Sequence, residues 1–318
     1  MPPPLREIVA AVRHAPPGRR LALLRALVPI LFQRAAQPSI AQACEFDSIE
    51  EYRPCYARLA HLLGRPGQTP APGEIEFLQQ VCTRATHYSG AIGGSEFFFL
   101  TAMASILAPA RTIEIGTSSG FSAALLAAAL HHRNPRSKET LVDTIDLHSN
   151  YAVDRTKPIG FEIPDLVPDL AGAVAVHTQR ESDFVPDLAR PNELGLVFID
   201  ADHQHPWPLL DLLRVTRYVQ SGGWIVLHDI QLGTMAATRP EKAATLTQGA
   251  PFGAEWLFDC WPFAKISGGN IGAVQLPRDR GALLPSALAL IERPFEVGAW
   301  SHRKFRKELG RSLVDLIE

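Results

Sequence analysis

The stretch Arg111-Thr-Ile-Glu-Ile-Gly-Thr-Ser-Ser-Gly-Phe-Ser122 decides the fold. A short β-branched run leads into a glycine turn, and an alanine- and leucine-rich helix is expected over residues 123–130. Glycines let a ligand approach the backbone of such a turn, and the N–H groups that open the next helix can face an anion. The stretch therefore predicts a strand, a turn and a helix with an anion site at the turn.

Short apolar runs recur along the chain, and most are separated by enough residues for a helix. This alternation is typical of a parallel sheet with helices on both faces. The last two runs are separated only by Ser267-Gly268-Gly269, which suits a hairpin and one antiparallel strand. The predicted fold class is α/β, a doubly wound, seven-stranded, mostly parallel sheet with strands at 112–115, 141–145, 173–177, 196–199, 224–227, 263–266 and 270–275.

The first quarter of the chain has a different pattern. Apolar residues recur at three- and four-residue intervals from Leu21 to Leu31, and Pro/Gly clusters lie at 16–18 and 64–73. The pattern predicts a helical N-terminal extension over residues 1–72 and a second domain over residues 73–318. Segments 148–172 and 230–260 are long for loops of an α/β protein, so we expect them to form lids or substrate walls.

Composition excludes several kinds of partner. The 318 residues include 31 Lys+Arg and 33 Asp+Glu, a net charge of −2, which argues against nucleic-acid binding. No apolar run approaches the length of about 18 residues that crosses a membrane. The four cysteines show no metal-binding spacing, so they are expected to be reduced thiols of a cytoplasmic protein.

Two interpretations of the glycine turn follow from its spelling. A dinucleotide fingerprint requires Gly-x-Gly-x-x-Gly, but Ser118 and Phe121 replace two of the glycines. A nucleophile elbow requires Gly-x-Ser-x-Gly, which residues 116–120 match, with Ser118 as the nucleophile. In that hydrolase fold the elbow follows several strands, whereas this turn follows the first, and beyond residue 228 the sequence contains only His302 as a histidine. A serine ester hydrolase is therefore kept as an alternative.

Acidic residues follow the fourth and fifth predicted strands. Asp200 stands in Val197-Phe-Ile-Asp-Ala-Asp-His-Gln-His205, and Asp229 ends Gly222-Gly-Trp-Ile-Val-Leu-His-Asp229. Neighbouring strands lie about 4.8 Å apart, so these two acids can share a metal ion, and carboxylates favour Mg²⁺. His203 is the candidate general base because imidazole titrates near neutral pH. Asp202 is the rival of Asp200 for the metal.

Together these motifs resemble those of class I S-adenosylmethionine-dependent methyltransferases. The pattern from Glu114 to Gly120 is similar to their cofactor loop, and the two acidic motifs are similar to those of small-molecule O-methyltransferases of the catechol and macrolide-sugar kind. The resemblance covers roughly residues 85–277. It implies a Rossmann-like methyltransferase fold, S-adenosylmethionine as the cofactor, Mg²⁺ as a metal, and methylation of a small-molecule acceptor.

The resemblance also implies roles for single residues. Asp200 and Asp229 would bind the metal, and Asp200 and His203 would act in catalysis. Asp146, which ends the second strand, would accept the ribose hydroxyls, and residues 90–95 would close over the methionine end. The expected cofactor-binding residues are Glu114, Gly116, Ser118, Gly120, Ser122, Asp146, Glu181, Ser182 and Asp200.

The chain also departs from the catechol-type pattern. Those enzymes carry an Asp-Asn pair where this sequence has His228-Asp229, and no third metal ligand stands out. A methyltransferase-like protein that binds the cofactor or a partner without turnover is therefore a further alternative. The N-terminal extension is expected to mediate dimer contacts or to cover the active site.

Overall fold

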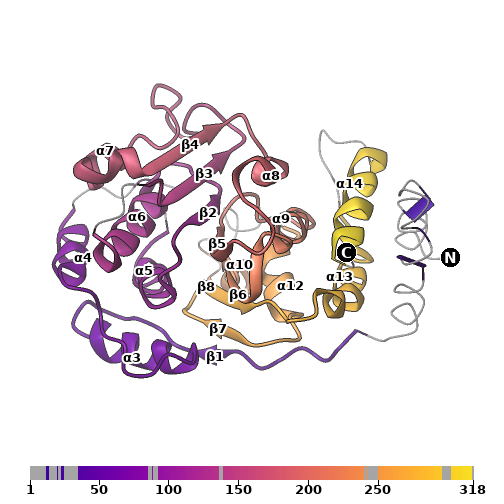
Figure 1. The fold of residues 1–318 in the computed structure, drawn as a ribbon, viewed down its shortest axis with the longest axis horizontal. Coiled ribbons are helices and arrows are strands. Elements are labelled where there is room, and N and C mark those ends of the chain that lie inside the picture. The colour runs from indigo at the N-terminus through magenta and orange to yellow at the C-terminus, as the bar shows by residue number, and fades with distance from the viewer. Residues whose placement is uncertain are drawn as a thin grey trace.

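An eight-stranded sheet forms the centre of the computed structural model (Figure 1). The structure describes residues 35–84, 88, 92–135, 139–239, 241, 250–295 and 302–316, with residues 12, 13, 20, 23 and 24. The strand order is β1-β7-β8-β6-β5-β2-β3-β4. The strands are β1 (Gln42–Ala43), β2 (Thr112–Ile115), β3 (Val142–Asp146), β4 (Val174–Thr178), β5 (Leu194–Ile199), β6 (Val219–His228), β7 (Lys265–Ser267) and β8 (Ile271–Gln275).

Helices cover both faces of the sheet, and each face has its own apolar core. The first core includes α3 (Tyr52–Leu62), α4 (Glu74–Cys82), α5 (Glu96–Leu107), α6 (Phe121–Arg133) and α7 (Ile163–Leu166). The second includes α8 (Val185–Leu188), α9 (Trp207–Thr216), α12 (Gly253–Asp259), α13 (Leu284–Ile291) and α14 (His302–Asp315). The remaining described helices are α10 (Leu232–Thr238) and the 3-10 helices η1 (Pro168–Ala173), η2 (Ser182–Phe184) and η4 (Arg280–Leu283).

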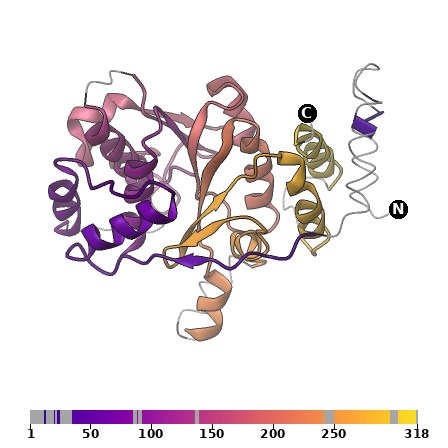
Figure 2. The ribbon, with the colours of Figure 1, turned by 60° about the horizontal axis from the view of Figure 1, so that its bottom comes forward.

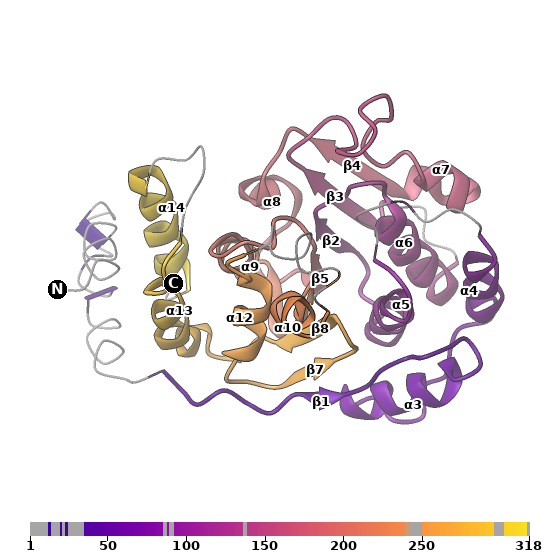
Figure 3. The same cartoon turned by 180° about the vertical axis from the view of Figure 1, so that it is seen from behind.

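The predicted fold class is confirmed, including all seven strands and the single reversal. β8 is antiparallel to both β6 and β7, and the other pairs are parallel. The sheet gains an eighth strand because β1 pairs with β7, where Gln42 faces Ile266. Figure 3 shows β1 along this outer edge. A two-residue strand leaves no alternating pattern in the sequence, so periodicity could not reveal it.

The N-terminal region is only partly helical where it is described. Residues 35–48 carry no helix, and α3 follows at Tyr52–Leu62. The predicted amphipathic helix from Leu21 to Leu31 lies outside the described residues except at positions 23 and 24. Tyr52 and Tyr56 of α3 are fully buried in the same core as α5 and α6. The boundary between residues 72 and 73 remains a prediction.

The two long connections contain short helices. Segment 148–172 holds α7 and most of η1, and segment 230–260 holds α10 and α12. Helix α10 projects away from the sheet (Figure 2). Residues 240 and 242–249 lie outside the described part of the chain. These segments therefore have more regular structure than loops do.

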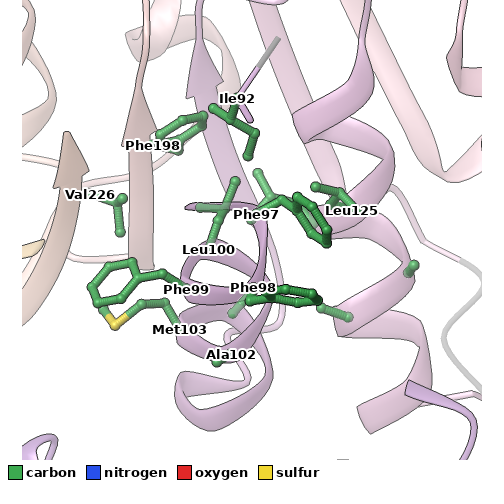
Figure 4. Packing of buried hydrophobic residues seen from close by; sticks show 14 of the residues in the cluster. Ile92, Phe97, Phe98, Phe99, Leu100, Ala102, Met103, Leu125, Phe198 and Val226 are labelled. Atoms are coloured by element: carbon green, nitrogen blue, oxygen red, sulfur yellow. The ribbon is translucent and has the colours of Figure 1, made fainter. Parts of the chain in front are cut away.

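Helix α5 is the apolar centre of the first core. Phe97, Phe98 and Phe99 are each at most 4% exposed, and they pack between the sheet and α6 (Figure 4). A helix that is apolar on all sides is stable only where protein surrounds it. The core therefore holds α5 in place, and its first residue, Glu96, contacts His228 at the end of β6.

Among the described helices, none combines the length and the apolar character that a membrane span requires.

Candidate active site

The glycine turn between β2 and α6 packs tightly against two other segments. Gly116 has a φ of 99°, and a Cβ at this position would overlap the carbonyl oxygen of Asp200. Gly120 has a φ of 89°, and its Cβ would lie 2.8 Å from the Cα of Gly160. Only glycine fits both positions, because each has a positive φ and a backbone neighbour. The turn therefore lies directly against the segment that carries Asp200.

Glu114 is a fully buried acid on the strand before the turn. Its Oε2 accepts a hydrogen bond from the Thr144 hydroxyl, whereas its Oε1 has no hydrogen-bond partner among the described residues. Burial raises the pKa of Glu114 to about 8, despite the nearby hydroxyls of Ser122 and Thr144, which lower it. Helix α6 carries no side-chain N-cap hydrogen bond, and the N-terminus of a helix favours an anion. An amino-acid group, with its ammonium and its carboxylate, fits these residues.

Asp146 braces the glycine turn. Its Oδ2 accepts hydrogen bonds from the N–H groups of Thr117 (3.1 Å) and Ser118 (3.0 Å), and its Oδ1 accepts one from the N–H of His148 (2.8 Å). Carboxylate oxygens offer about four lone-pair sites in total, so these three bonds leave capacity for a ligand hydroxyl. Ser122 is buried in the first turn of α6. The contacts expected between these residues and the cofactor remain predictions.

Glu181 and Ser182 are engaged with helix α9. The buried hydroxyl of Ser182 donates to Asp211 and accepts from Arg214 (3.0 Å). Glu181 lies 3.5 Å from the same arginine. Burial raises the pKa of Asp211 to about 6. These side chains therefore have a structural role in the protein, and their predicted contact with adenine stays a prediction.

Asp200, His203 and Asp229 come together at the ends of β5 and β6. The two strands are parallel neighbours, and each of the three residues offers a ligand atom within 4.8 Å of the others. Nε2 of His203 lies 2.9 Å from Oδ2 of Asp229. No third ligand stood out in the sequence, and the structure places His203 beside both acids. Two carboxylates and an imidazole are a suitable donor set for a divalent metal.

His228 lies beneath this cluster and links it to helix α5. Its Nδ1 lies 2.9 Å from Oδ1 of Asp200, and its Nε2 lies 2.9 Å from Oε2 of Glu96. Asn270 donates a 2.6 Å hydrogen bond to Asp229. Sequence reasoning missed Glu96 and Asn270. A glutamate that opens a helix and an asparagine in a hairpin are common for local reasons, so neither gave a signal.

In this cluster the carboxylates raise the pKa values of the two histidines, and the histidines lower the pKa of Asp229. Burial by itself would lower the pKa of His228, but the charge of Asp200 raises it well above its ordinary value. Burial would likewise lower the pKa of His203, whereas its hydrogen bond with Asp229 raises it overall. Burial would raise the pKa of Asp229, but the two histidines hold it far below its usual range. The carboxylates therefore favour the protonated form of both imidazoles, and a cation bound to those carboxylates would favour the neutral form instead.

Three other polar residues of the quoted motifs lie outside the cluster. Asp202 is exposed, and its carboxylate accepts from the N–H of Gln204 (2.8 Å). His205 is buried against Trp256, and burial lowers its pKa to about 4. Ser118 has a φ of 50°, but no described residue hydrogen-bonds to its hydroxyl. The described part of the chain therefore gives Ser118 no histidine of a hydrolase triad.

Comparisons with known proteins show what the segment that holds these features is similar to. Residues 113–230 match the family model described as a methyltransferase domain. A comparison with curated proteins finds no match.

Several solved structures are similar to the chain. The O-methyltransferase TomG from Streptomyces achromogenes is 18% identical and is matched over 72% of this chain and 99% of its own, with a TM-score of 0.42. An O-methyltransferase from Bacillus cereus is 19% identical over 72% of this chain and 100% of its own, with a TM-score of 0.42. The Podospora anserina methyltransferase PaMTH1 is 13% identical and is matched over 68% of this chain and 92% of its own, with a TM-score of 0.43.

The matched segment runs from β2 to just beyond β6. It includes the glycine turn, Asp146 and the cluster of Asp200, His203 and Asp229. The match agrees with the predicted methyltransferase family: residues 113–230 are similar to a methyltransferase domain, and the candidate site lies within them.

Proposed function

We propose that this protein is an S-adenosylmethionine-dependent O-methyltransferase that acts on a small molecule with the help of a divalent metal ion. The observation that carries the proposal is the contact between the glycine turn and the acidic cluster, because Gly116 packs on the backbone of Asp200. The strand order reverses between β2 and β5, and open α/β sheets bind ligands at such a point. A cofactor and an acceptor bound there would meet.

The cofactor fits the residues around β2 and β3. The unpartnered Oε1 of Glu114 would accept the ammonium group, and the N-terminus of α6 would face the carboxylate. Asp146 would accept the ribose hydroxyls. When bound, the cofactor supplies an electrophilic methyl group.

Asp200 and Asp229 would hold the metal ion, which supplies Lewis acidity to the acceptor hydroxyl. His203 would take the hydroxyl proton. Its Nε2 faces Asp229, so Nδ1 is the nitrogen that can accept the proton, and the 2.9 Å contact stabilises the ring once it is protonated. This arrangement favours Mg²⁺ if only the carboxylates bind, and Mn²⁺ or a softer ion if the imidazole binds as well.

Methyl transfer from radiolabelled S-adenosylmethionine to a panel of phenols and sugars tests the proposal. We expect transfer that chelator abolishes and Mg²⁺ or Mn²⁺ restores. Asp229→Asn should lower the rate at least tenfold, whereas Ser118→Ala should reduce it less. Transfer that is indifferent to chelator and to Asp229→Asn would refute the role of the metal. Ester hydrolysis that Ser118→Ala abolishes would instead establish the hydrolase.

We further propose that the acceptor is a small molecule rather than a nucleic acid or a membrane, because the chain carries a net charge of only −2. The four cysteines are free, as expected in the cytoplasm.

We also propose that the protein is a homodimer. Light scattering of the full chain tests it, and a monomeric mass at all concentrations would refute it.

A further inference from the structure

We propose that Glu96 is a positioning residue of the metal site, acting through His228 on Asp200. The inference rests on the metal-assisted function proposed above and adds a residue to it. Glu96 belongs to α5, far along the chain from the two acidic motifs. It nevertheless ends a continuous chain of hydrogen bonds that begins at a predicted metal ligand.

The hydrogen bonds run from carboxylate to imidazole to carboxylate. Oδ1 of Asp200 lies 2.9 Å from Nδ1 of His228, and Nε2 of the same ring lies 2.9 Å from Oε2 of Glu96. Both ring nitrogens therefore face carboxylates, so neither has a lone pair directed at a metal. His228 stands next to Asp229 in the sequence, yet this geometry makes it a support for the ligands rather than a ligand.

Glu96 is well placed to hold the imidazole still. It is the first residue of α5, whose next residues, Phe97, Phe98 and Phe99, are buried in the core. The same Oε2 also accepts from the N–H of Gly93 at 3.3 Å. Because α5 is buried on one face of the sheet, the carboxylate of Glu96 is held in place, and its contact with Nε2 holds the ring of His228 in turn.

The two predicted metal ligands have different hydrogen-bond partners, although Nδ1 of His228 also lies 3.6 Å from Oδ1 of Asp229. Asn270 and His203 both contact the carboxylate of Asp229. Asp200 has one hydrogen-bonding side-chain partner among the described residues, His228. With Oδ1 held in this way, Oδ2 of Asp200 is the oxygen left for the metal. Partners that orient a ligand in this manner typically contribute 10–100-fold to metal affinity.

Calorimetric titration of Mn²⁺ into the full chain tests the inference with Glu96→Ala and Glu96→Gln. We expect Glu96→Ala to weaken Mn²⁺ binding by about 10–100-fold. Glu96→Gln should weaken it less, because the amide oxygen still accepts from Nε2 of His228. The affinity for S-adenosylhomocysteine, measured separately, should not change, because the glycine turn does not depend on Glu96.

The control is Glu74→Gln, which alters a fully buried glutamate of α4. Glu74 is hydrogen-bonded to Tyr52 (2.6 Å) and Ser105, remote from the metal site. This control should lower the melting temperature and leave Mn²⁺ affinity unchanged.

Three results would overturn the inference. Mn²⁺ binding by both Glu96 variants that equals that of the wild type would remove the role of Glu96 while leaving the metal site intact. A parallel loss of Mn²⁺ and S-adenosylhomocysteine binding would show a general structural role. Wild-type protein that binds S-adenosylhomocysteine but no Mn²⁺ would refute the metal site itself, and the role of Glu96 with it.

Discussion

Glu114 shows how burial prepares a single residue for a cationic ligand. Its pKa is raised to about 8, chiefly by burial, so it is mostly protonated at pH 7 in the free protein. An ammonium group placed at its unpartnered Oε1 favours the carboxylate, and the proton must leave. At pH 7 we therefore expect S-adenosylhomocysteine binding to release up to one proton. The release should fall as the pH rises through about 8 and vanish only well above it, where the carboxyl is already ionised.

Calorimetry in buffers of different ionisation enthalpy measures this release. In Glu114→Gln the binding should be weaker and the heat should no longer depend on the buffer. A wild-type heat that is equal in all buffers at pH 7 would contradict this role of Glu114.

Gly116 makes a second residue-scale prediction. Gly116→Ala would force a Cβ into the carbonyl of Asp200 at a φ of 99°, so the turn and the acidic segment must separate. We expect a loss of stability of about 1–3 kcal/mol and a loss of both S-adenosylhomocysteine and Mn²⁺ binding.

Gly64→Ala is the matched control, since Gly64 has a φ of 71° but no atom within 4 Å of its Cβ position. It should lower stability and leave both ligand affinities unchanged. Unchanged ligand binding by Gly116→Ala would disprove the contact.

At the scale of secondary-structure elements, the sequence predicted those features that local patterns of apolar and acidic residues encode. The buried strands and the acids that end β5 and β6 follow from local patterns and from the rules of parallel sheets. Glu96 and Asn270 could not be found in this way, because they reach the site from α5 and from the β7–β8 hairpin. The sequence predicted His203 as a general base but did not predict that it lies beside both acids. Its position depends on the path of the turn that follows Asp200.

The segment from residue 148 to 163 forms a strap over the glycine turn. The N–H of Gly160 donates to Ser118 (3.0 Å), and the N–H of Glu162 donates to Ser119 (2.9 Å). Nζ of Lys157 lies 4.2 Å from the centroid of the Tyr88 ring. Lys157→Met should remove this cation–π attraction, which contributes about 0.5–2 kcal/mol, and should loosen the strap.

Hydrogen exchange of the strap measures that loosening. We expect faster exchange at residues 157–163 in Lys157→Met and a smaller change in Lys157→Arg, which keeps the positive charge. Equal exchange in wild type and Lys157→Met would show that the cation does not hold the strap.

Across the whole molecule, a buried polar network joins α3 and α4 to α5 and α6. Glu74 of α4 is fully buried and bonds to Tyr52 of α3 and to Ser105 of α5. Arg133 of α6 donates to Ser105 (2.9 Å). Because these helices share one core, we expect thermal unfolding of the full chain in a single transition.

Glu74→Ala should lower the stability of the whole chain by about 1–3 kcal/mol, because it leaves buried hydroxyls without their acceptor. Calorimetry of the full chain checks this together with the single transition. Two transitions, with only one shifted by Glu74→Ala, would instead establish that residues 1–72 and 73–318 fold separately.

The most direct test of the central claim is a calorimetric titration of S-adenosylhomocysteine into the full chain, first in chelator and then with excess Mg²⁺. We expect micromolar binding to one site per chain in chelator. We also expect a change in heat or affinity with Mg²⁺ that Asp229→Asn abolishes. Absence of binding under both conditions would contradict the account, and the glycine turn would then have another role.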